Sequence, residues 1–194
     1  MNNGVWLCEL YSNLNIRFNE AEGYIQLYYN GQWNNWISSN TTEEDVYTKY
    51  LYYKGTDYSD ITGGWSGYAY KSSVSTAESV VAPTVTKNAS DMVFKVTYGA
   101  GTVGSVFSGY AIDLTDYNYI EIEYVATLGT SSGEVGFQCV KEKANKYVIN
   151  KSVKIQSTSI TTATLNISDL SGSYFLGVGM YYSQVKIYSI KLVR

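Results

Sequence analysis

The sequence predicts an all-β chain, an antiparallel jelly-roll β-sandwich with an N-terminal β-hairpin extension. Three observations lead to this prediction. Apolar and polar residues alternate over many short runs, clusters of Gly, Ser, Asn and Asp separate the runs, and no stretch carries an apolar stripe with helical spacing. Short alternating strands with turn residues between them are typical of sandwiches and barrels. The runs are also rich in Val, Ile, Thr and Tyr, which favour strands.

The first expected element is a hairpin close to the N-terminus. Residues 24–29 and 32–37 are rich in aromatic side chains and flank the pair Asn30-Gly31. An Asn-Gly pair suits a two-residue hairpin turn because both of its positions need positive φ. After this hairpin, residues 40–45 predict at most one helical turn, begun by a capping-box spacing and followed by no apolar stripe.

The strands of the sandwich are expected in later runs that are short and bounded by turn residues. These runs are residues 47–54, 92–98, 120–127, 134–142, 163–167, 174–182 and 186–193. Strict alternation along the last of them places Ile187 and Ile190 on opposite faces of the sheet. Two stretches rich in Gly and Ser, 99–109 and 129–133, are expected to be loops.

A polar segment at residues 38–46 interrupts the aromatic pattern and suggests where the chain divides. We expect residues 1–45 to form the hairpin extension and residues 46–194 to form the sandwich. The alternative is a single sandwich that uses all 194 residues.

Composition argues against several classes of protein. Fourteen basic and 17 acidic residues give a net charge of −3, which is no electrostatic footprint for nucleic acid. No window approaches the roughly 20 apolar residues of a membrane-spanning helix, so no membrane insertion is expected. The chain has no His, which is the commonest general base and metal ligand. The sequence therefore predicts a protein that is not an enzyme, with no catalytic residue, no cofactor and no metal site.

The remaining candidates for chemistry are weaker still. Glu121 and Glu123 share one strand face at about 7 Å spacing, and a solvated edge explains them better than glycoside hydrolysis does. Asp57 and Asp60 lack the dense oxygen spacing of a calcium loop. Cys139 is in phase with apolar neighbours, which predicts a buried, unreactive thiol.

Two resemblances cover residues 47–194. The run GYAIDLTDYNYIEIEY (109–124) and the ending at 165–180 and 185–193 resemble carbohydrate-binding or galactose-binding-like jelly rolls. The run YLYYKGTDYSDITGGW (50–65), taken with that ending, is similar to β-sandwich modules in tail-associated minor structural proteins of phages that infect Gram-positive gut bacteria.

These resemblances imply a non-catalytic phage tail or virion module with a structural or adhesion role. Its implied partners are other tail proteins, further copies of itself in a homo-oligomer, and glycans of the host cell surface. Its implied location is the virion, after synthesis in the host cytoplasm. The lack of a basic leader before Arg17 agrees with that, and equally with a fragment of a longer exported chain. The alternative is a carbohydrate-binding module of a secreted bacterial glycosidase. A small glycosidase acting through Glu121 or Glu123 is a third hypothesis.

Sugar binding needs flat aromatic faces with planar polar groups around them. The loop at residues 57–70 offers both, and we expect the turn at Gly63-Gly64 to expose the Trp65 indole. The alternative is that Trp65 fills the end of the sandwich. The binding residues expected in this loop are Asp60, Trp65, Tyr68 and Tyr70.

Two other aromatic pairs are expected to contribute. Trp33 and Trp36 lie three residues apart, on opposite faces of a regular strand, so one is expected in a core and the other exposed. Packing between subunits is the alternative role for this pair. Tyr181 and Tyr182 are expected at the turn between the last two strands, where adjacent tyrosines place one ring outward.

Overall fold

The chain divides into two compact units, Met1–Tyr47 and Thr48–Arg194. The computed structural model describes residues 5–11, 14–19, 24–29, 32–35, 48–97, 99, 101–129 and 135–194. In the first four of these ranges, Gln26 is the one residue whose side chain is described. The division falls two residues after the boundary expected from composition.

The first unit is a four-stranded antiparallel sheet in which each strand pairs with the next along the chain. Its strands are β1 (Val5–Tyr11), β2 (Leu14–Asn19), β3 (Tyr24–Tyr29) and β4 (Gln32–Asn35). The predicted pairing of residues 24–29 with the run that starts at residue 32 is confirmed, with Tyr29 opposite Gln32. The strands β1 and β2 were not expected. The helical turn expected at residues 40–45 lies outside the described residues.

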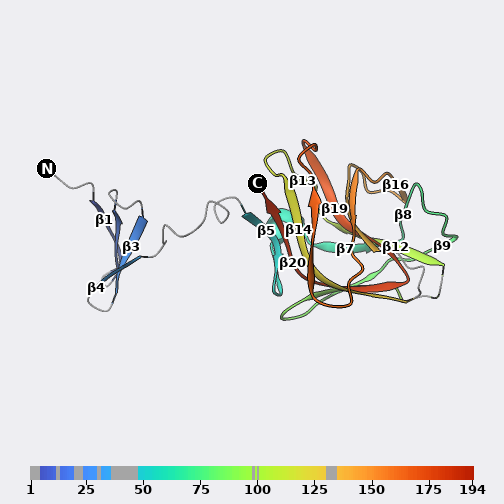
Figure 1. The fold of residues 1–194 in the computed structure, drawn as a ribbon, viewed down its shortest axis with the longest axis horizontal. Coiled ribbons are helices and arrows are strands. Elements are labelled where there is room, and N and C mark those ends of the chain that lie inside the picture. The colour runs from blue at the N-terminus through green and yellow to red at the C-terminus, as the bar shows by residue number, and fades with distance from the viewer. Residues whose placement is uncertain are drawn as a thin grey trace. The chain divides into compact units, whose positions relative to one another are not determined.

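The second unit is a sandwich of two sheets that are almost entirely antiparallel, which confirms the predicted fold class (Figure 1). Sheet I has the strand order β10-β11-β20-β14-β18, with β5 paired to β20 and β6 to β5. Its strands are β5 (Thr48–Tyr53), β6 (Thr56–Asp57), β10 (Thr84–Lys87), β11 (Met92–Lys95), β14 (Tyr119–Leu128), β18 (Thr161–Asn166) and β20 (Ser183–Val193).

Sheet II has the strand order β17-β15-β19-β12-β7, with β13 paired to β19 and β9 paired in parallel to β12. Its strands are β7 (Trp65–Tyr68), β9 (Ser79–Val80), β12 (Thr102–Ser108), β13 (Ile112–Asp113), β15 (Val135–Val140), β17 (Lys151–Lys154) and β19 (Ser173–Tyr181). A separate parallel pair joins β8 (Lys71–Ser72) to β16 (Lys146–Tyr147). The short helix α2 spans Ser59–Thr62.

The core lies between the two sheets and largely follows the alternation of the strands, but β20 departs from it. Val185 and Ile187 are buried, and so are Ile190 and Leu192. The register between β14 and β20 shifts here, so that Tyr188 is an extra residue in β20. Such a bulge returns the next apolar residues to the same face of the strand. The expectation that Ile187 and Ile190 lie on opposite faces is therefore wrong.

The expectation of a loop at residues 99–109 is also wrong, because most of this stretch forms β12. All seven residues of β12 are buried, and the strand lies between β19 and β7 in sheet II. Close packing requires a glycine in this strand, because a Cβ on Gly104 would lie 2.0 Å from the carbonyl oxygen of Val81. The stretch at 130–133 lies outside the described residues.

Cys139 confirms the prediction of a buried free thiol, since its side chain is fully buried in the core. Burial raises its pKa from 9.0 to about 12. A raised pKa favours the protonated folded state, so this contribution to stability is complete below about pH 9 and is lost as the pH rises toward 12.

We therefore expect the free energy of unfolding of the wild type to fall more steeply above pH 9 than that of Cys139→Ala. One group with this shift contributes a difference of about 2 kcal/mol between pH 8 and pH 10.5. Urea titrations of both proteins at several pH values measure it. Parallel pH profiles would show that the thiol has no such role.

Candidate functional site

The outer face of sheet II, away from the core, carries an unusual number of small residues. Along β19, Leu176, Val178 and Met180 point into the core, while Gly177 and Gly179 alternate with them on the other face. The pairing register sets Gly136 of β15 and Ser105 of β12 on either side of Gly179. The middle of this face is consequently a low floor of backbone and short side chains.

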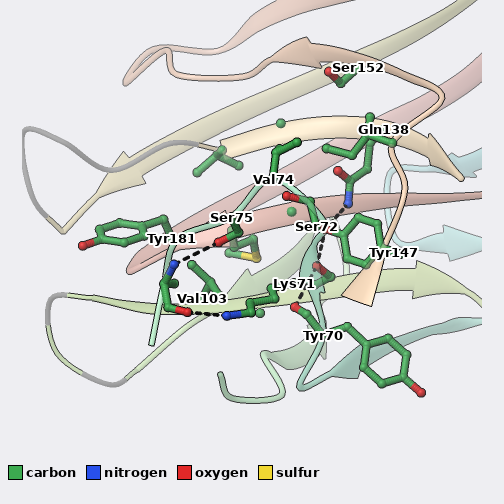
Figure 2. A pocket seen from close by; sticks show the side chains of 18 of the residues that line it. Tyr70, Lys71, Ser72, Val74, Ser75, Val103, Gln138, Tyr147, Ser152 and Tyr181 are labelled. Carbon is green, nitrogen blue, oxygen red and sulfur yellow. Dashed lines mark hydrogen bonds between the residues drawn. The ribbon is translucent and has the colours of Figure 1, made fainter. Parts of the chain in front are cut away.

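A groove of about 780 Å³ lies over this floor (Figure 2). The strands β12, β15 and β19 form its base, residues of β17 line one side, and the segment of residues 70–79 lines the other. Ligand sites in proteins commonly have volumes of roughly 300–1,000 Å³. The groove therefore has room for several units of an extended ligand.

The glycines of the floor differ in what they allow. A Cβ on Gly177 would lie 2.2 Å from the carbonyl oxygen of Val106 and 2.3 Å from the Phe107 ring, so packing excludes a side chain there. A Cβ on Gly136 would meet only the carbonyl oxygen of Val153, at 3.6 Å. Gly177 is required for packing, whereas Gly136 leaves open space in the groove.

Three buried polar side chains form a hydrogen-bonded chain at the base of the groove. The Nε2 atom of Gln138 donates to the Tyr147 hydroxyl at 2.7 Å, and that hydroxyl lies 2.8 Å from the Oγ of Ser105. The Ser105 hydroxyl donates to the carbonyl oxygen of Tyr70 at 3.3 Å. Burial raises the pKa of Tyr147, and its hydrogen bonds with Ser105 and Gln138 oppose that rise. We call this the Gln138–Tyr147–Ser105 network.

Aromatic side chains cover the part of the outer face beside this network. The rings of Tyr68 and Tyr70 stack with centroids 5.0 Å apart, and Tyr147 packs edge-on against Phe107 at 5.1 Å. The Nζ of Lys143 lies 4.4 Å from the centroid of the Phe175 ring and donates to the carbonyl oxygens of residues 108 and 109. This second small core fixes the end of the groove at which Tyr147 lies.

Residues 71–79, which we call the strap, form the wall of the groove. The strap is tied down by β8, whose Ser72 pairs with Tyr147 of β16, and by the hydrogen bond from the Ser73 amide to the Tyr147 carbonyl oxygen. Within the strap, the Nζ of Lys71 donates to the carbonyl oxygen of Ala77 at 2.6 Å. Val74 is 81% exposed and lies beside the groove (Figure 2).

Three of the eight predicted binding residues lie in or beside the groove. Tyr70 and Tyr181 both line the groove, and Tyr68 stacks on Tyr70 beside it. Figure 2 shows Tyr181 and Tyr147 at opposite ends of the groove, with the Tyr70 ring pointing away from Tyr181. A role for these tyrosines in binding stays a prediction.

The expectation of an exposed Trp65 indole is wrong. The side chain is 5% exposed and belongs to the core, with its ring centroid 6.1 Å from that of Phe94. Gly63 and Gly64 do adopt positive φ, but the turn that they form leads directly into β7. Trp65 is the first residue of this strand, opposite Ser108 of β12, and its side chain points into the core.

The other predicted binding residues lie away from the groove or outside the described part of the chain. Asp60 is exposed on α2, and Tyr182 occupies the predicted turn between β19 and β20 with φ of 35°. Neither residue lines the groove. The side chain of Trp33 on β4 and the whole of Trp36 are outside the described part of the chain.

Sequence reasoning missed Gln138, Tyr147 and Ser105. A signal for the first was present, because Gln138 interrupts an apolar run on the same face as Gly136. The alternation of Gly177 and Gly179 with apolar residues was a signal for the floor. Nothing local indicated Ser105 or Tyr147, which approach Gln138 from other segments of the chain.

Two of the carboxylates considered from the sequence are held by partners away from the groove. Glu121 forms a salt bridge of 2.7 Å with Lys191 on sheet I. Asp57 accepts hydrogen bonds from Thr62 and Lys87. Among the residues whose side chains are described, no group of three or more Asp, Glu or Cys side chains is arranged to hold a metal ion. In the same part of the chain, no helix is long and apolar enough to cross a membrane.

Comparisons with known proteins give a distant likeness. No protein-family model matches the chain, and no curated protein matches it. Among solved structures, a family 29 carbohydrate-binding module has a TM-score of 0.47 at 10% identity, over 75% of this chain and 87% of that one.

A variant of such a module complexed with cellulohexaose has a TM-score of 0.47 at 11% identity, over 76% and 92% of the two chains. A family 29 module from Piromyces equi has a TM-score of 0.45 at 12% identity, over 75% and 89%. Nothing about the function of this chain follows from likenesses of this size.

The contrast between Gly177 and Gly136 makes a direct test of the floor. Gly177→Ala is expected to lower the free energy of unfolding by more than about 2 kcal/mol, because the new methyl group overlaps backbone and ring atoms. Gly136→Ala is the matched control and is expected to change it by no more than about 0.5 kcal/mol. Urea denaturation measures both, and equal losses would contradict the assignment of the two glycines.

Proposed function

We propose that the second unit is a non-catalytic module that binds a neutral saccharide chain in the groove over sheet II. The observation that carries this proposal is the polar but largely uncharged lining of the groove. Hydroxyl and amide groups of Ser, Thr, Tyr and Gln lie around a floor of glycine. Uncharged hydrogen-bonding groups together with aromatic surface suit the alternating hydroxyl and C–H faces of sugar rings.

The charges at the groove are few and are placed at its margins. Lys71 is engaged within the strap, and Lys154 lies on β17 opposite Gly136 in the pairing register. Glu78 is the only carboxylate among the described residues that line the groove. Glycoside hydrolysis generally needs two carboxyl groups flanking the scissile bond. A single marginal carboxylate therefore supports binding without cleavage.

The larger particle or protein that carries the module is a separate question, and for it the two alternatives predicted from the sequence remain. A phage tail particle, with the virion location and tail-protein partners that it entails, and a secreted bacterial glycosidase both use glycan binding for attachment. The groove supports the activity that these carriers share. Neighbouring genes for tail assembly or for polysaccharide degradation distinguish the two carriers.

The proposal predicts measurable binding of short neutral glycans. Isothermal titration with β-1,4-linked hexasaccharides of glucose, mannose, xylose and galactose is expected to show binding of at least one of them. Gly136→Phe is expected to weaken that binding at least tenfold, because the new ring enters the open space of the groove. The control Thr162→Phe adds the same ring on an exposed site of β18 in sheet I and is expected to leave affinity unchanged.

Two results would contradict the proposal. One is the absence of binding by the wild type to every hexasaccharide of this set. The other is binding that Gly136→Phe and Thr162→Phe affect equally, which would place the ligand away from the groove.

A further inference from the structure

One side chain in the groove uses only one end of its amide within the protein. The side chain of Gln138 is 2% exposed and lines the groove. Its Nε2 donates to Tyr147, but within the described part of the chain its Oε1 accepts no hydrogen bond. This oxygen is therefore an acceptor that a ligand in the groove can use.

The polarity of the Gln138–Tyr147–Ser105 network follows from its far end. The carbonyl oxygen of Tyr70 can only accept a hydrogen bond, so the single hydroxyl proton of Ser105 is directed to it. Ser105 must then accept from Tyr147, whose only proton is used in that bond. The Tyr147 oxygen is left as the acceptor for Gln138, and only the Nε2 of the amide can donate to it.

This sequence of bonds removes the usual freedom of a glutamine amide to turn over. A turned amide would set Oε1 against a tyrosine oxygen that has no proton left to give. The backbone also makes room for the amide, because a Cβ on Gly179 would lie 3.1 Å from Nε2 and 3.2 Å from Oε1. Burial raises the pKa of Tyr147, which keeps its proton available for Ser105 at neutral pH.

We propose that Gln138 is a specificity-determining residue whose Oε1 accepts a hydrogen bond from a hydroxyl group of the bound saccharide. Ser105 and Tyr147 act as positioning residues that hold the acceptor toward the ligand. The proposal rests on the function proposed above and adds a chemical requirement to it. At this point of the groove the ligand must present a donor, so a free hydroxyl is accepted, whereas a carboxylate, a sulfate ester or a methyl ether is disfavoured.

Two substitutions of Gln138 separate an acceptor from a donor. Gln138→Leu removes both groups of the amide and is expected to weaken binding of the preferred hexasaccharide at least tenfold. Gln138→Glu has no N–H, so the Tyr147 proton turns from Ser105 to one oxygen of the new carboxylate, while the other oxygen remains an acceptor for the ligand. It is expected to bind within about threefold of the wild type. The control Thr162→Ala changes an exposed residue of β18 in sheet I, away from the groove, with an expected change below twofold.

Isothermal titration of these four proteins with the same β-1,4-linked hexasaccharides distinguishes the outcomes. If Gln138→Glu loses as much affinity as Gln138→Leu, the ligand does not use an acceptor here and the inference is overturned. If Gln138→Leu binds like the wild type while Gly136→Phe does not bind, the inference fails and the proposed function stands. If the wild type binds none of the sugars, both fail.

A measurement on the wild type covers the case in which a variant does not fold. The Gln138 side-chain amide signals of ¹⁵N-labelled protein are expected to keep their hydrogen-bonded position when the hexasaccharide is added, while the Nε2 nitrogen shifts as its carbonyl accepts a bond. Gln138 amide signals that move to a free, rapidly exchanging position would overturn the inference, because the amide would then have left Tyr147.

Discussion

The arrangement of the groove depends on one constraint, which is that a backbone carbonyl oxygen can only accept hydrogen bonds. The Tyr70 carbonyl oxygen accepts the last hydrogen bond in a buried chain of three side chains. Each of these side chains has few protons that it can donate. The acceptor at one end therefore decides the orientation of the amide at the other. β8 follows directly after Tyr70 and begins the strap, and its parallel partner β16 contains Tyr147, so the network and the wall of the groove are held by the same strand pair.

A second constraint is the balance between packing and open space on sheet II. Part of its outer face is closed by rings, such as Phe107 against Tyr147, and there the strands are packed on both sides. The groove exists where this cover stops and the floor has glycine or serine instead of larger residues. A sheet face that is left open for binding buries less apolar area and so loses some stabilisation. The second small core beside the groove offsets part of that loss.

Much of the sandwich was predictable because strand alternation is a local signal. The runs at 120–127 and 174–182 read correctly, since one face of each is consistently apolar. β12 was not predictable in the same way, because it is buried on both faces and its Gly and Ser residues are typical of loops. The prediction of an exposed Trp65 was wrong for a related reason, since only the pairing of β7 with β12 shows that its side chain faces the core.

The candidate site was the least predictable part of the molecule. Tyr70 and Tyr181 were identified as candidate binding residues, but the groove also needs residues that are far apart in the sequence. Ser105, Gln138 and Tyr147 carry no motif, and their chemistry arises from the pairing register and from the crossing of β16 over sheet II. Local patterns contain neither of these, so a sequence alone gives the surface residues and not the oriented acceptor.

The central claim, that the network presents an oxygen to the groove, is tested most directly by neutron diffraction from crystals of the perdeuterated protein. The account predicts a deuteron of Gln138 Nε2 directed at the Tyr147 oxygen, the Tyr147 deuteron directed at Ser105, and the Ser105 deuteron directed at the Tyr70 carbonyl oxygen. A Tyr147 deuteron that points to Gln138 instead, with the amide nitrogen facing the groove, would contradict it.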